Sequence, residues 1–455
     1  MLSSIKSKLI LNKIFSCLIK KLIFKITLRN KALQSKLDLE LKDFKEYNLL
    51  IEFNKKYKTD ITSTDIKNLN IKENKIMNSG LRALNQIEFQ YLKELHLIDN
   101  YFSIINNLII DNFNFNNLEV IDFSYNHIAD LTILTKADFK NLKVLNLDHN
   151  NLKDINVLSE IKFKKLETLI LSGNQISDLT ALTKMKLPFL KNLFLHRNMI
   201  SDLNYFEKIE FYNLEKLDLC VNLISDISPL SKANFEKLKY LNLRFNKITK
   251  ADVLKNFNFP NLEVLNLSEN NDLSDIYFLE NTDFKYLKEL YLIDMNELSD
   301  INGFENTNFK NLEKLDLSKN RIYDIDVFEK VNFLELKELN LGSNFGYCYD
   351  EEDFDITKLK NFKYLEKLNL SKTNISDISM FKNVKFHELE ELDLSSNKIK
   401  DISCLNEIYF ENLKLLNLND NPIDTKKNSE IIKKLKSKIN QVDIKEYEER
   451  EEEEK

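Results

Sequence analysis

One sixteen-residue phrase recurs along almost the whole chain and limits what the chain can fold into. Its clearest copy is Phe211–Asp226, where leucines, an asparagine and an isoleucine follow the spacing L-x-x-L-x-L-x-x-N-x-I. This spacing starts fifteen times, first at Ile66 and last at Leu413, and the commonest step between copies is 24 residues. One register held over about 350 residues indicates internal repeats, which stack side by side into a solenoid.

The positions of the phrase have different physical roles. Leucines at its first, fourth and sixth positions are expected to point inward from a short strand and to form the core. Strands of neighbouring copies lie about 4.8 Å apart, so fifteen parallel strands extend about 70 Å along the array. The asparagine at the ninth position can donate and accept hydrogen bonds for the backbone of a neighbouring copy. Met295 and Thr373 replace it in two copies, which predicts looser turns there.

Two further residue types recur at a fixed distance from the phrase; the set of equivalent positions in successive copies is called a column. A phenylalanine precedes the first leucine by three residues in thirteen copies, which predicts a spine of stacked rings. An aspartate follows the turn in ten copies, where it suits the N-terminal cap of a short helix on the convex side. Ten carboxylates in register could also suggest a metal ladder, and we interpret them as caps. They are Asp130, Asp154, Asp178, Asp202, Asp226, Asp275, Asp300, Asp324, Asp377 and Asp401.

Charge and cysteine content restrict the classes of partner and compartment. The net charge is −6, but residues 1–36 hold nine Lys and Arg and no acid, so the remainder has 57 basic against 72 acidic residues. A body with this acidic excess is not a nucleic-acid binder by charge. The four cysteines, Cys17, Cys220, Cys348 and Cys404, form no C-x-x-C motif, and we expect a reducing compartment, the cytoplasm.

Residues 1–52 differ from the repeats and allow three interpretations. Their apolar residues recur at helical spacing with lysines between them, which predicts a basic helical N-terminal cap. The segment Ile14–Leu18 (IFSCL) resembles the core of the F-box adaptor motif, although the usual Leu-Pro opening is absent. A basic amphipathic helix for a membrane surface or for organelle import is the third interpretation. Lysines interrupt every apolar run, so a secretory signal or a transmembrane span is not expected.

The pattern divides the chain into five segments. Residues 1–52 are the N-terminal cap, 53–65 a linker, 66–425 the solenoid, 426–444 a C-terminal helical cap and 445–455 an acidic tail. Apolar residues from Ile431 to Ile439 predict the cap helix, and 442–444 an edge strand that hides the last core layer. One step between copies is 29 residues, which predicts a surface loop around 345–358.

Three segments place the repeats in a known group. Ile176–Leu179, Ile224–Leu230 and Ile375–Ile378 resemble leucine-rich-repeat proteins of the short S-D-I subclass, which includes the regulator of protein phosphatase 1 and the bacterial internalins. The resemblance covers residues 66–425 and implies a protein that binds another protein on its concave sheet. The expected fold is an α/β solenoid, a leucine-rich-repeat horseshoe of about fifteen mostly 24-residue repeats. It has a concave parallel β-sheet, convex short helical or 3₁₀ segments and helical caps at both ends.

Departures from the commonest residues predict a binding patch. Positions 3, 5, 7 and 8 are expected on the concave face; position 5 is Asn or Asp in eleven copies, and position 7 is most often Ser. The departures gather on about four adjacent strands and are rich in aromatic, His and Arg side chains, as interface hot spots are. The alternative interpretation is that the residue type at these positions is weakly constrained and has drifted without a function. The predicted partner-binding residues are His149, Ile170, Phe194, His196, Arg197, Cys220, Tyr240, Arg244 and Phe245.

No constellation in the sequence predicts catalysis. The chain has no phosphate-binding glycine loop, no G-x-S-x-G and no H-E-x-x-H motif. His96, His149 and His196 are expected on separate strands, too far apart to share a metal. We therefore expect a monomeric, non-enzymatic scaffold without metal or cofactor that binds another protein and no nucleic acid. The alternatives are an F-box-type substrate receptor of a ubiquitin ligase and an internalin-like surface adhesin.

Overall fold

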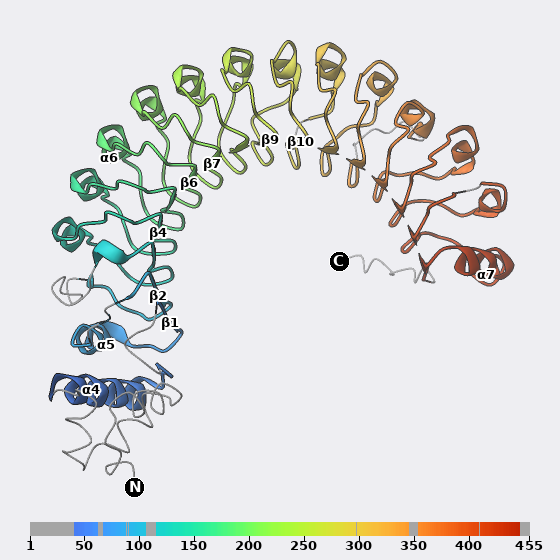
Figure 1. Ribbon diagram of the computed structural model, residues 1–455. Coiled ribbons are helices and arrows are strands. Elements are labelled where there is room, and N and C mark those ends of the chain that lie inside the picture. Colours follow the sequence, from blue (N-terminus) through green and yellow to red (C-terminus); the bar gives the residue numbers. More distant parts are fainter. Residues whose placement is uncertain are drawn as a thin grey trace, which may run out of the picture. The chain divides into compact units, whose positions relative to one another are not determined.

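The computed structural model describes residues 41–61, 67–87, 89, 91–105, 115–296, 298–344, 354–408 and 410–445. The chain divides into two compact units, Met1–Met199 and Ile200–Lys455, here called unit 1 and unit 2 and described one at a time. In each unit, short parallel strands form one side of the stacked coils and short helices form the other (Figure 1). The predicted solenoid of parallel strands and 3₁₀ segments is confirmed.

The described part of unit 1 has six parallel strands, and each strand pairs with the next one along the chain. Most helices between the strands are 3₁₀ helices, labelled η, and α6 is a short α-helix in the equivalent place. In chain order the elements are α4 (Leu41–Tyr57), β1 (Asn68–Lys72), α5 (Met77–Leu84), β2 (Glu94–Ile98), η3 (Phe115–Asn117), β3 (Val120–Asp122), η4 (Thr132–Lys136), β4 (Val144–Asn146), η5 (Asn156–Glu160), β5 (Thr168–Ile170), α6 (Thr180–Lys184) and β6 (Asn192–Phe194).

Unit 2 continues the pattern, and its strands also pair in parallel with their neighbours in the chain. Its elements are η6 (Asn204–Lys208), β7 (Lys216–Asp218), η7 (Ser228–Lys232), β8 (Tyr240–Asn242), η8 (Asp252–Asn256), β9 (Val264–Asn266), η9 (Tyr277–Leu279), β10 (Glu289–Tyr291), η10 (Asn302–Asn306), β11 (Lys314–Asp316), η11 (Asp326–Glu329), β12 (Glu338–Asn340), η12 (Ile356–Leu359), β13 (Lys367–Asn369), η13 (Ser379–Asn383), β14 (Glu391–Asp393), η14 (Ser403–Asn406), β15 (Leu415–Asn417), α7 (Ser429–Lys438) and β16 (Gln441–Asp443).

The core is built from the columns that the sequence predicts. Leu214, Leu217 and Leu219 are buried, as are the equivalent leucines of the other coils. The phenylalanine column forms stacked pairs: the ring centroids of Phe139 and Phe163 are 5.6 Å apart, with their planes 24° apart. Phe235 with Phe259, Phe309 with Phe333, and Phe333 with Phe362 are stacked in the same way. The predicted ring spine is confirmed for these coils.

Buried asparagines join one coil to the next. Asn150 Nδ2 donates to the carbonyl oxygens of Phe123, one coil earlier, at 3.0 Å and of Leu147 at 3.1 Å, and its Oδ1 accepts from the backbone N–H of Ile128 at 3.0 Å. The same bonds recur at Asn174, Asn246, Asn397 and Asn421. The amide therefore satisfies backbone groups that burial would otherwise leave without partners.

The two substituted turns keep part of this network. Thr373 Oγ1 donates to the carbonyl of Leu370 at 2.7 Å, in place of the amide. The backbone N–H of Met295 donates to Asn320 Oδ1 at 2.8 Å, and the Met295 side chain is fully buried.

The aspartates after the turn bind the start of each short helix. Asp130 Oδ1 accepts from the N–H of Thr132, the first residue of η4, at 2.8 Å. The other nine aspartates of this column accept an equivalent bond two residues on. The aspartates therefore bind the first helical N–H, as a cap does, but from one residue before the N-cap position where the sequence predicted them; for η4 the N-cap is Leu131.

The ends of the array are closed by helices. At the N-terminal end, α4 packs beside α5 and buries Leu50, Phe53 and Tyr57, so the helix extends five residues into the linker expected over 53–65. At the C-terminal end, α7 and β16 occupy the places where a cap helix and an edge strand are predicted. The predicted basic and F-box-like helix before residue 41, the insertion core at 345–353 and the acidic residues from 446 on lie outside the described residues.

Lysine and glutamate alternate at position 2 of the coils and pair between neighbouring coils. Lys93 and Lys143 both contact Glu119, at 2.5 and 2.7 Å, and Lys191 contacts Glu167 at 2.8 Å. In unit 2 the equivalent pairs are Lys239–Glu215, Lys288–Glu263, Lys337–Glu313 and Lys414–Glu390.

Candidate functional site

The nine predicted patch residues fall into two clusters, one in each unit. His149, Ile170, Phe194, His196 and Arg197 form the unit 1 cluster. The unit 2 cluster consists of Cys220, Tyr240, Arg244 and Phe245. The two clusters are described separately below, and the single patch stays a prediction.

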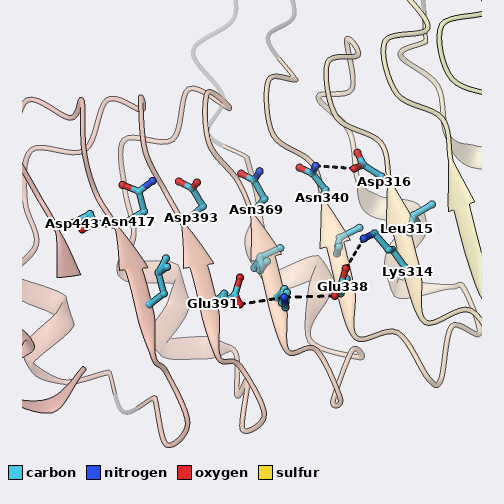
Figure 2. Close-up of a pocket in the computed structure, with 14 residues that line it drawn as sticks. Lys314, Leu315, Asp316, Glu338, Asn340, Asn369, Glu391, Asp393, Asn417 and Asp443 are labelled. Carbon is cyan, nitrogen blue, oxygen red and sulfur yellow. Dashed lines mark hydrogen bonds and ion pairs between the residues drawn. The ribbon is translucent and has the colours of Figure 1, made fainter. Parts of the chain in front are cut away.

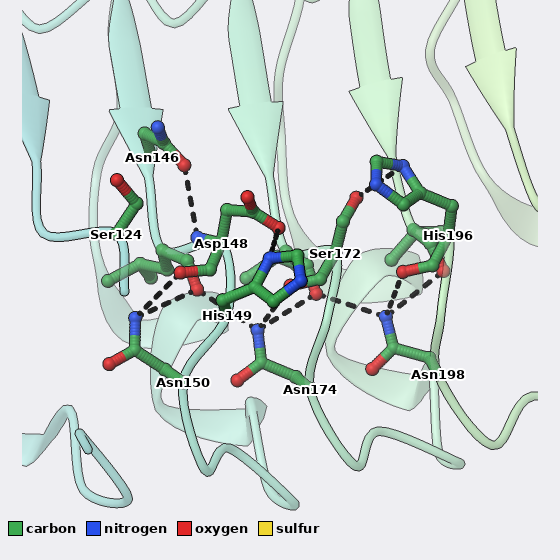
Figure 3. A network of polar contacts seen from close by, with 12 residues as sticks. Ser124, Asn146, Asp148, His149, Asn150, Ser172, Asn174, His196 and Asn198 are labelled. Carbon is green, nitrogen blue, oxygen red and sulfur yellow. Dashed lines mark hydrogen bonds and ion pairs between the residues drawn. The ribbon is translucent and has the colours of Figure 1, made fainter. Parts of the chain in front are cut away.

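The position 5 column explains why Asn and Asp are its usual residues. Asn146 Oδ1 accepts from the backbone N–H of Asp148 at 3.0 Å (Figure 3). Asp122 Oδ1 accepts from the backbone N–H of Ser124 at 3.0 Å in the same way. The side chain therefore fixes the backbone as it leaves the strand, a structural task performed in most coils. Ile170 and Phe194 cannot make this bond, so these two coils have exchanged a structural polar group for an apolar one.

Ile170 and Phe194 form the apolar centre of the unit 1 cluster. They lie directly opposite each other on the paired strands β5 and β6, and both side chains are half-buried. Val120 and Val144, opposite each other on β3 and β4, are also half-buried. Four consecutive strands therefore present an apolar side chain on the solvent-facing side of the sheet, which we call the apolar stripe. Val120 and Val144 are offset from Ile170 and Phe194 by two residues along the strands, because Val144 lies opposite Thr168 and Ile170 opposite Asn146.

His149 lies in the turn that follows β4. Its ring stacks on Tyr125, with centroids 4.4 Å apart and planes 8° apart, and its Nδ1 lies 2.8 Å from Asp148 Oδ1 (Figure 3). Gly173 occupies the equivalent position of the next coil, with φ +61°, and a Cβ there would lie 2.7 Å from His149 Nδ1. The glycine thus leaves room for the imidazole.

His196 and Arg197 follow β6. His196 Nδ1 and Ser172 Oγ are 2.9 Å apart, which ties the imidazole to the preceding coil (Figure 3). Arg197 is exposed and has φ +55°. His149, Arg197 and Phe245 all occupy position 8, three residues beyond a strand, in left-handed turns. They therefore lie at the edge where the chain leaves the sheet, and their part in a binding patch stays a prediction.

The unit 2 cluster combines a half-buried phenol with an exposed pair. Burial, followed by the nearby Asp218 carboxylate, raises the pKa of Tyr240 to about 12. Arg244 Nε donates to Glu269 Oε1 at 2.6 Å, and Phe245 is 52% exposed. Cys220 is a free thiol, partly exposed, and its N–H donates to Asp218 Oδ1 at 3.0 Å. This cluster offers an aromatic ring, a guanidinium and a phenol on strands β7 and β8 and the turns after them.

The position 5 column holds one residue that the sequence prediction missed. Tyr291 on β10 replaces the usual Asn or Asp, and its hydroxyl donates to Glu289 Oε2 at 2.7 Å. Burial, and then this hydrogen bond, raises the pKa of Tyr291. Lys314 Nζ lies 5.7 Å from the centre of its ring, within cation–π distance. The departure from Asx was the available signal, as it was for Ile170 and Phe194.

Strands β11 to β16 present a different, charged surface. Lys314 contacts Glu338 at 2.8 Å, and Lys367 contacts Glu391 at 3.2 Å and Glu338 at 3.8 Å (Figure 2). Asn340 Nδ2 donates to Asp316 Oδ2 at 2.9 Å. Because Lys314 and Lys367 are already paired with Glu338 and Glu391, a partner that used these charged groups would have to displace internal ion pairs.

The described residues contain no candidate metal-binding cluster and no candidate membrane-spanning helix. Within them, no three His, Cys, Asp or Glu side chains are placed to hold a metal ion. No helix among these residues is both long and apolar enough to cross a membrane.

Comparisons with known proteins agree with the fold. The family "Leucine Rich repeats (2 copies)" matches residues 116–160, 164–208, 212–256 and 365–407. No curated protein matches the chain by sequence.

Several solved structures are similar to this chain to different extents. A leucine-rich-repeat protein of Leptospira interrogans is 22% identical, with a TM-score of 0.57 over 83% of this chain and 96% of that one. An internalin of Listeria monocytogenes is 23% identical, with a TM-score of 0.49 over 88% and 94%. The leucine-rich-repeat ectodomain of the Arabidopsis thaliana receptor kinase GASSHO1, solved with CASPARIAN STRIP INTEGRITY FACTOR 2, is 22% identical, with a TM-score of 0.50 over 75% and 40%. Its repeated strand, asparagine turn and 3₁₀ segment give the chain the fold of a leucine-rich-repeat solenoid.

Proposed function

We propose that this protein is a non-enzymatic scaffold that binds another protein through the strand face of its repeats. The observation that carries the proposal is the apolar pair Ile170–Phe194, which replaces a structural Asx at two consecutive coils. Giving up the turn hydrogen bond costs stability, and both apolar side chains keep part of their surface in water. Contact with a partner would gain free energy, because it removes this remaining apolar surface from water.

The chemistry of both clusters supports the same function. Aromatic and Arg side chains are enriched in the residues that dominate interface energies. The unit 1 cluster supplies Phe194 and Arg197, and the unit 2 cluster Tyr240, Arg244 and Phe245. The strand face of a repeat protein is an extended surface on which such side chains project from rigid strands.

Capture of partners with matched variants tests the proposal. The full chain is tagged, incubated with an extract of the cells that express it, and the retained proteins are identified by mass spectrometry. A partner should be retained by the wild type and lost by the double variant Phe194→Ala, Arg244→Ala. Tyr323→Ala is the matched control, because Tyr323 is 60% exposed and lies just before η11, away from the strands. Equal recovery by all three proteins would refute the proposed binding surface.

Two finer proposals concern the compartment and the class of scaffold. We propose that the protein works in the cytoplasm, either as a regulator of the kind that controls protein phosphatase 1 or as a substrate receptor of a ubiquitin ligase. The free thiols of Cys220 and Cys404 suit a reducing compartment.

A deletion separates the two classes of scaffold. Removal of residues 1–40 leaves α4 and its buried Leu50, Phe53 and Tyr57 in place, so the array keeps its cap. A ligase adaptor captured by the full chain and lost on this deletion would support the receptor. A phosphatase catalytic subunit retained by both forms would support the regulator instead.

A further inference from the structure

We propose that the strand face of unit 1 binds a partner segment in which a Lys or Arg stands three or four positions along the chain from an apolar residue. The inference rests on the proposed function, because it names the chemistry of the partner that the scaffold binds. It follows from two features of this face that lie side by side: the apolar stripe, whose larger pair is on β5 and β6, and a group of carboxylates on β2, on β3 and in the turn after β4.

The apolar stripe supplies the first half of the recognition. Val120, Val144, Ile170 and Phe194 occupy four consecutive strands, β3 to β6, which at normal strand spacing span about 14 Å. All four side chains are half-buried, so each keeps apolar surface exposed to solvent. The larger pair, Ile170 and Phe194, lies at the β6 end. One or two apolar side chains of a partner would fit against this pair.

The carboxylates supply the second half. Glu94 lies on β2, Asp122 on β3 and Asp148 in the turn after β4, and their side chains are 42%, 16% and 18% exposed. Their ion-pair contacts within the described residues are with imidazoles. His96 Nε2 lies 3.6 Å from Glu94 and its Nδ1 3.8 Å from Asp122, both longer than a hydrogen bond.

Among the described residues, no lysine forms an ion pair with these three acids. Lys93, Lys143 and Lys191 immediately precede strands β2, β4 and β6 and pair with Glu119 and Glu167 at position 2. The acidic end of the face therefore keeps its negative charge, and a cation from a partner would meet it without displacing a lysine. Charge complementarity of this kind speeds association and selects against acidic partners.

The geometry fixes the spacing of the segment. From Asp122 on β3 to Ile170 and Phe194 on β5 and β6 is two or three strand steps, or about 10–14 Å. An extended chain advances about 3.3 Å per residue, so three or four residues span that distance. The segment thus runs across the strands, with its apolar residue over β5 and β6 and its cation beside Glu94 and Asp122.

Selection from random peptides tests the chemistry without presuming a partner. Phage-displayed peptides of about a dozen random residues are selected on the immobilised full chain, and the enriched peptides are synthesised and titrated. Enriched sequences should contain an aromatic or aliphatic residue with a Lys or Arg three or four positions away. Enrichment of acidic peptides, of peptides without a cation, or of none would overturn the inference.

Isosteric variants locate the binding. The triple variant Glu94→Gln, Asp122→Asn, Asp148→Asn removes the charges, and Asn at 122 retains the oxygen that accepts from Ser124 N–H. We expect about tenfold weaker binding of the selected peptides, with the difference shrinking at high salt. Phe194→Ala should weaken binding at least as much. Asp178→Asn, the same charge change at the cap of α6, should leave it unchanged.

The outcomes distinguish this inference from the proposed function. If the triple variant binds the peptides as the wild type does, the assigned chemistry is wrong. If a partner is still captured from cell extract and lost with the Phe194→Ala, Arg244→Ala variant, the scaffold function stands without it. If neither peptides nor partner depend on Phe194, both proposals fall.

Discussion

The imidazole of His149 lies flat on the ring of Tyr125, with the two centroids 4.4 Å apart. Both residues have positive φ, +49° and +55°, in the turns that follow β4 and β3. Gly173 continues the same column one coil later, and its missing Cβ leaves room for His149. The stack and the glycine therefore form one packing arrangement along the edge of unit 1.

Gly173→Ala should destabilise the protein by about 1–3 kcal/mol. A side chain at φ +61° costs about 1–2 kcal/mol, and the added Cβ would lie 2.7 Å from His149 Nδ1. Urea unfolding followed by circular dichroism measures the loss. The control is the same substitution in a His149→Ala background, where only the cost of the left-handed backbone remains. Equal losses in the two backgrounds would show that the imidazole does not restrict this position.

Asn150→Ala should lower the free energy of unfolding by roughly 2–4 kcal/mol, because three backbone groups lose their hydrogen-bond partner in a buried turn. Asn151→Ala is the matched control: its side chain is exposed, and we expect a change within about 0.5 kcal/mol. Asn150→Thr should fall between the two, because Thr373 shows that a hydroxyl can keep one of the bonds. A loss at Asn150 no larger than at Asn151 would contradict the role of the buried amide.

The structural roles that were predicted correctly are those for which the residue type and its spacing allow one placement in the coil. Leu217 must be buried, Asn150 must satisfy buried backbone groups, and Asp130 must bind the free N–H groups of a helix start. Each of these constraints acts inside one coil or between adjacent coils, and the same residue type recurs at that position in most copies of the repeat. The fold could therefore be read from the sequence coil by coil.

The turn after each strand could not be read in this way. Left-handed backbone is usually signalled by glycine, yet this position holds Tyr125, His149, Arg197, Val221 and Phe245, and only Gly173 follows the rule. The neighbouring coils hold these residues in place, so the constraint is absent from the local sequence. For that reason the sequence predicted the repeat positions of the candidate site residues, but not the left-handed turns in which some of them lie.

Glu119→Gln should make the protein less sensitive to acid. Hydrogen bonds from Lys143 and then Lys93 lower the pKa of Glu119 from 4.5 to about 2. A carboxyl with a lowered pKa stabilises the folded state above its unfolded pKa, and this contribution is lost as the pH falls from about 4.5 to 2. The urea midpoints of wild type and variant should therefore differ at pH 6 and converge near pH 2.

Salt and a second glutamate serve as controls for Glu119. The group is exposed, so the difference at pH 6 should shrink in concentrated salt, which screens surface ion pairs. Glu160→Gln removes the same charge from the end of η5, away from the Lys–Glu column. If Glu160→Gln and Glu119→Gln shift the acid limb equally, the effect belongs to net charge and not to the paired column.

Tyr240→Phe should make the protein more resistant to alkali. Burial, and then the Asp218 carboxylate, raises the pKa of Tyr240 from 10.0 to about 12. Between these two values the unfolded chain loses the phenolic proton first, so the wild type loses stability as the pH rises through this range. Phenylalanine has no proton to lose, and the urea midpoint of the variant should fall less steeply between pH 9 and pH 12. Tyr212→Phe, at a tyrosine that is 52% exposed, is the matched control and should follow the wild type. A Tyr240→Phe variant whose midpoint falls as steeply as that of the wild type would mean that the Tyr240 hydroxyl ionises as readily in the folded protein as in the unfolded chain.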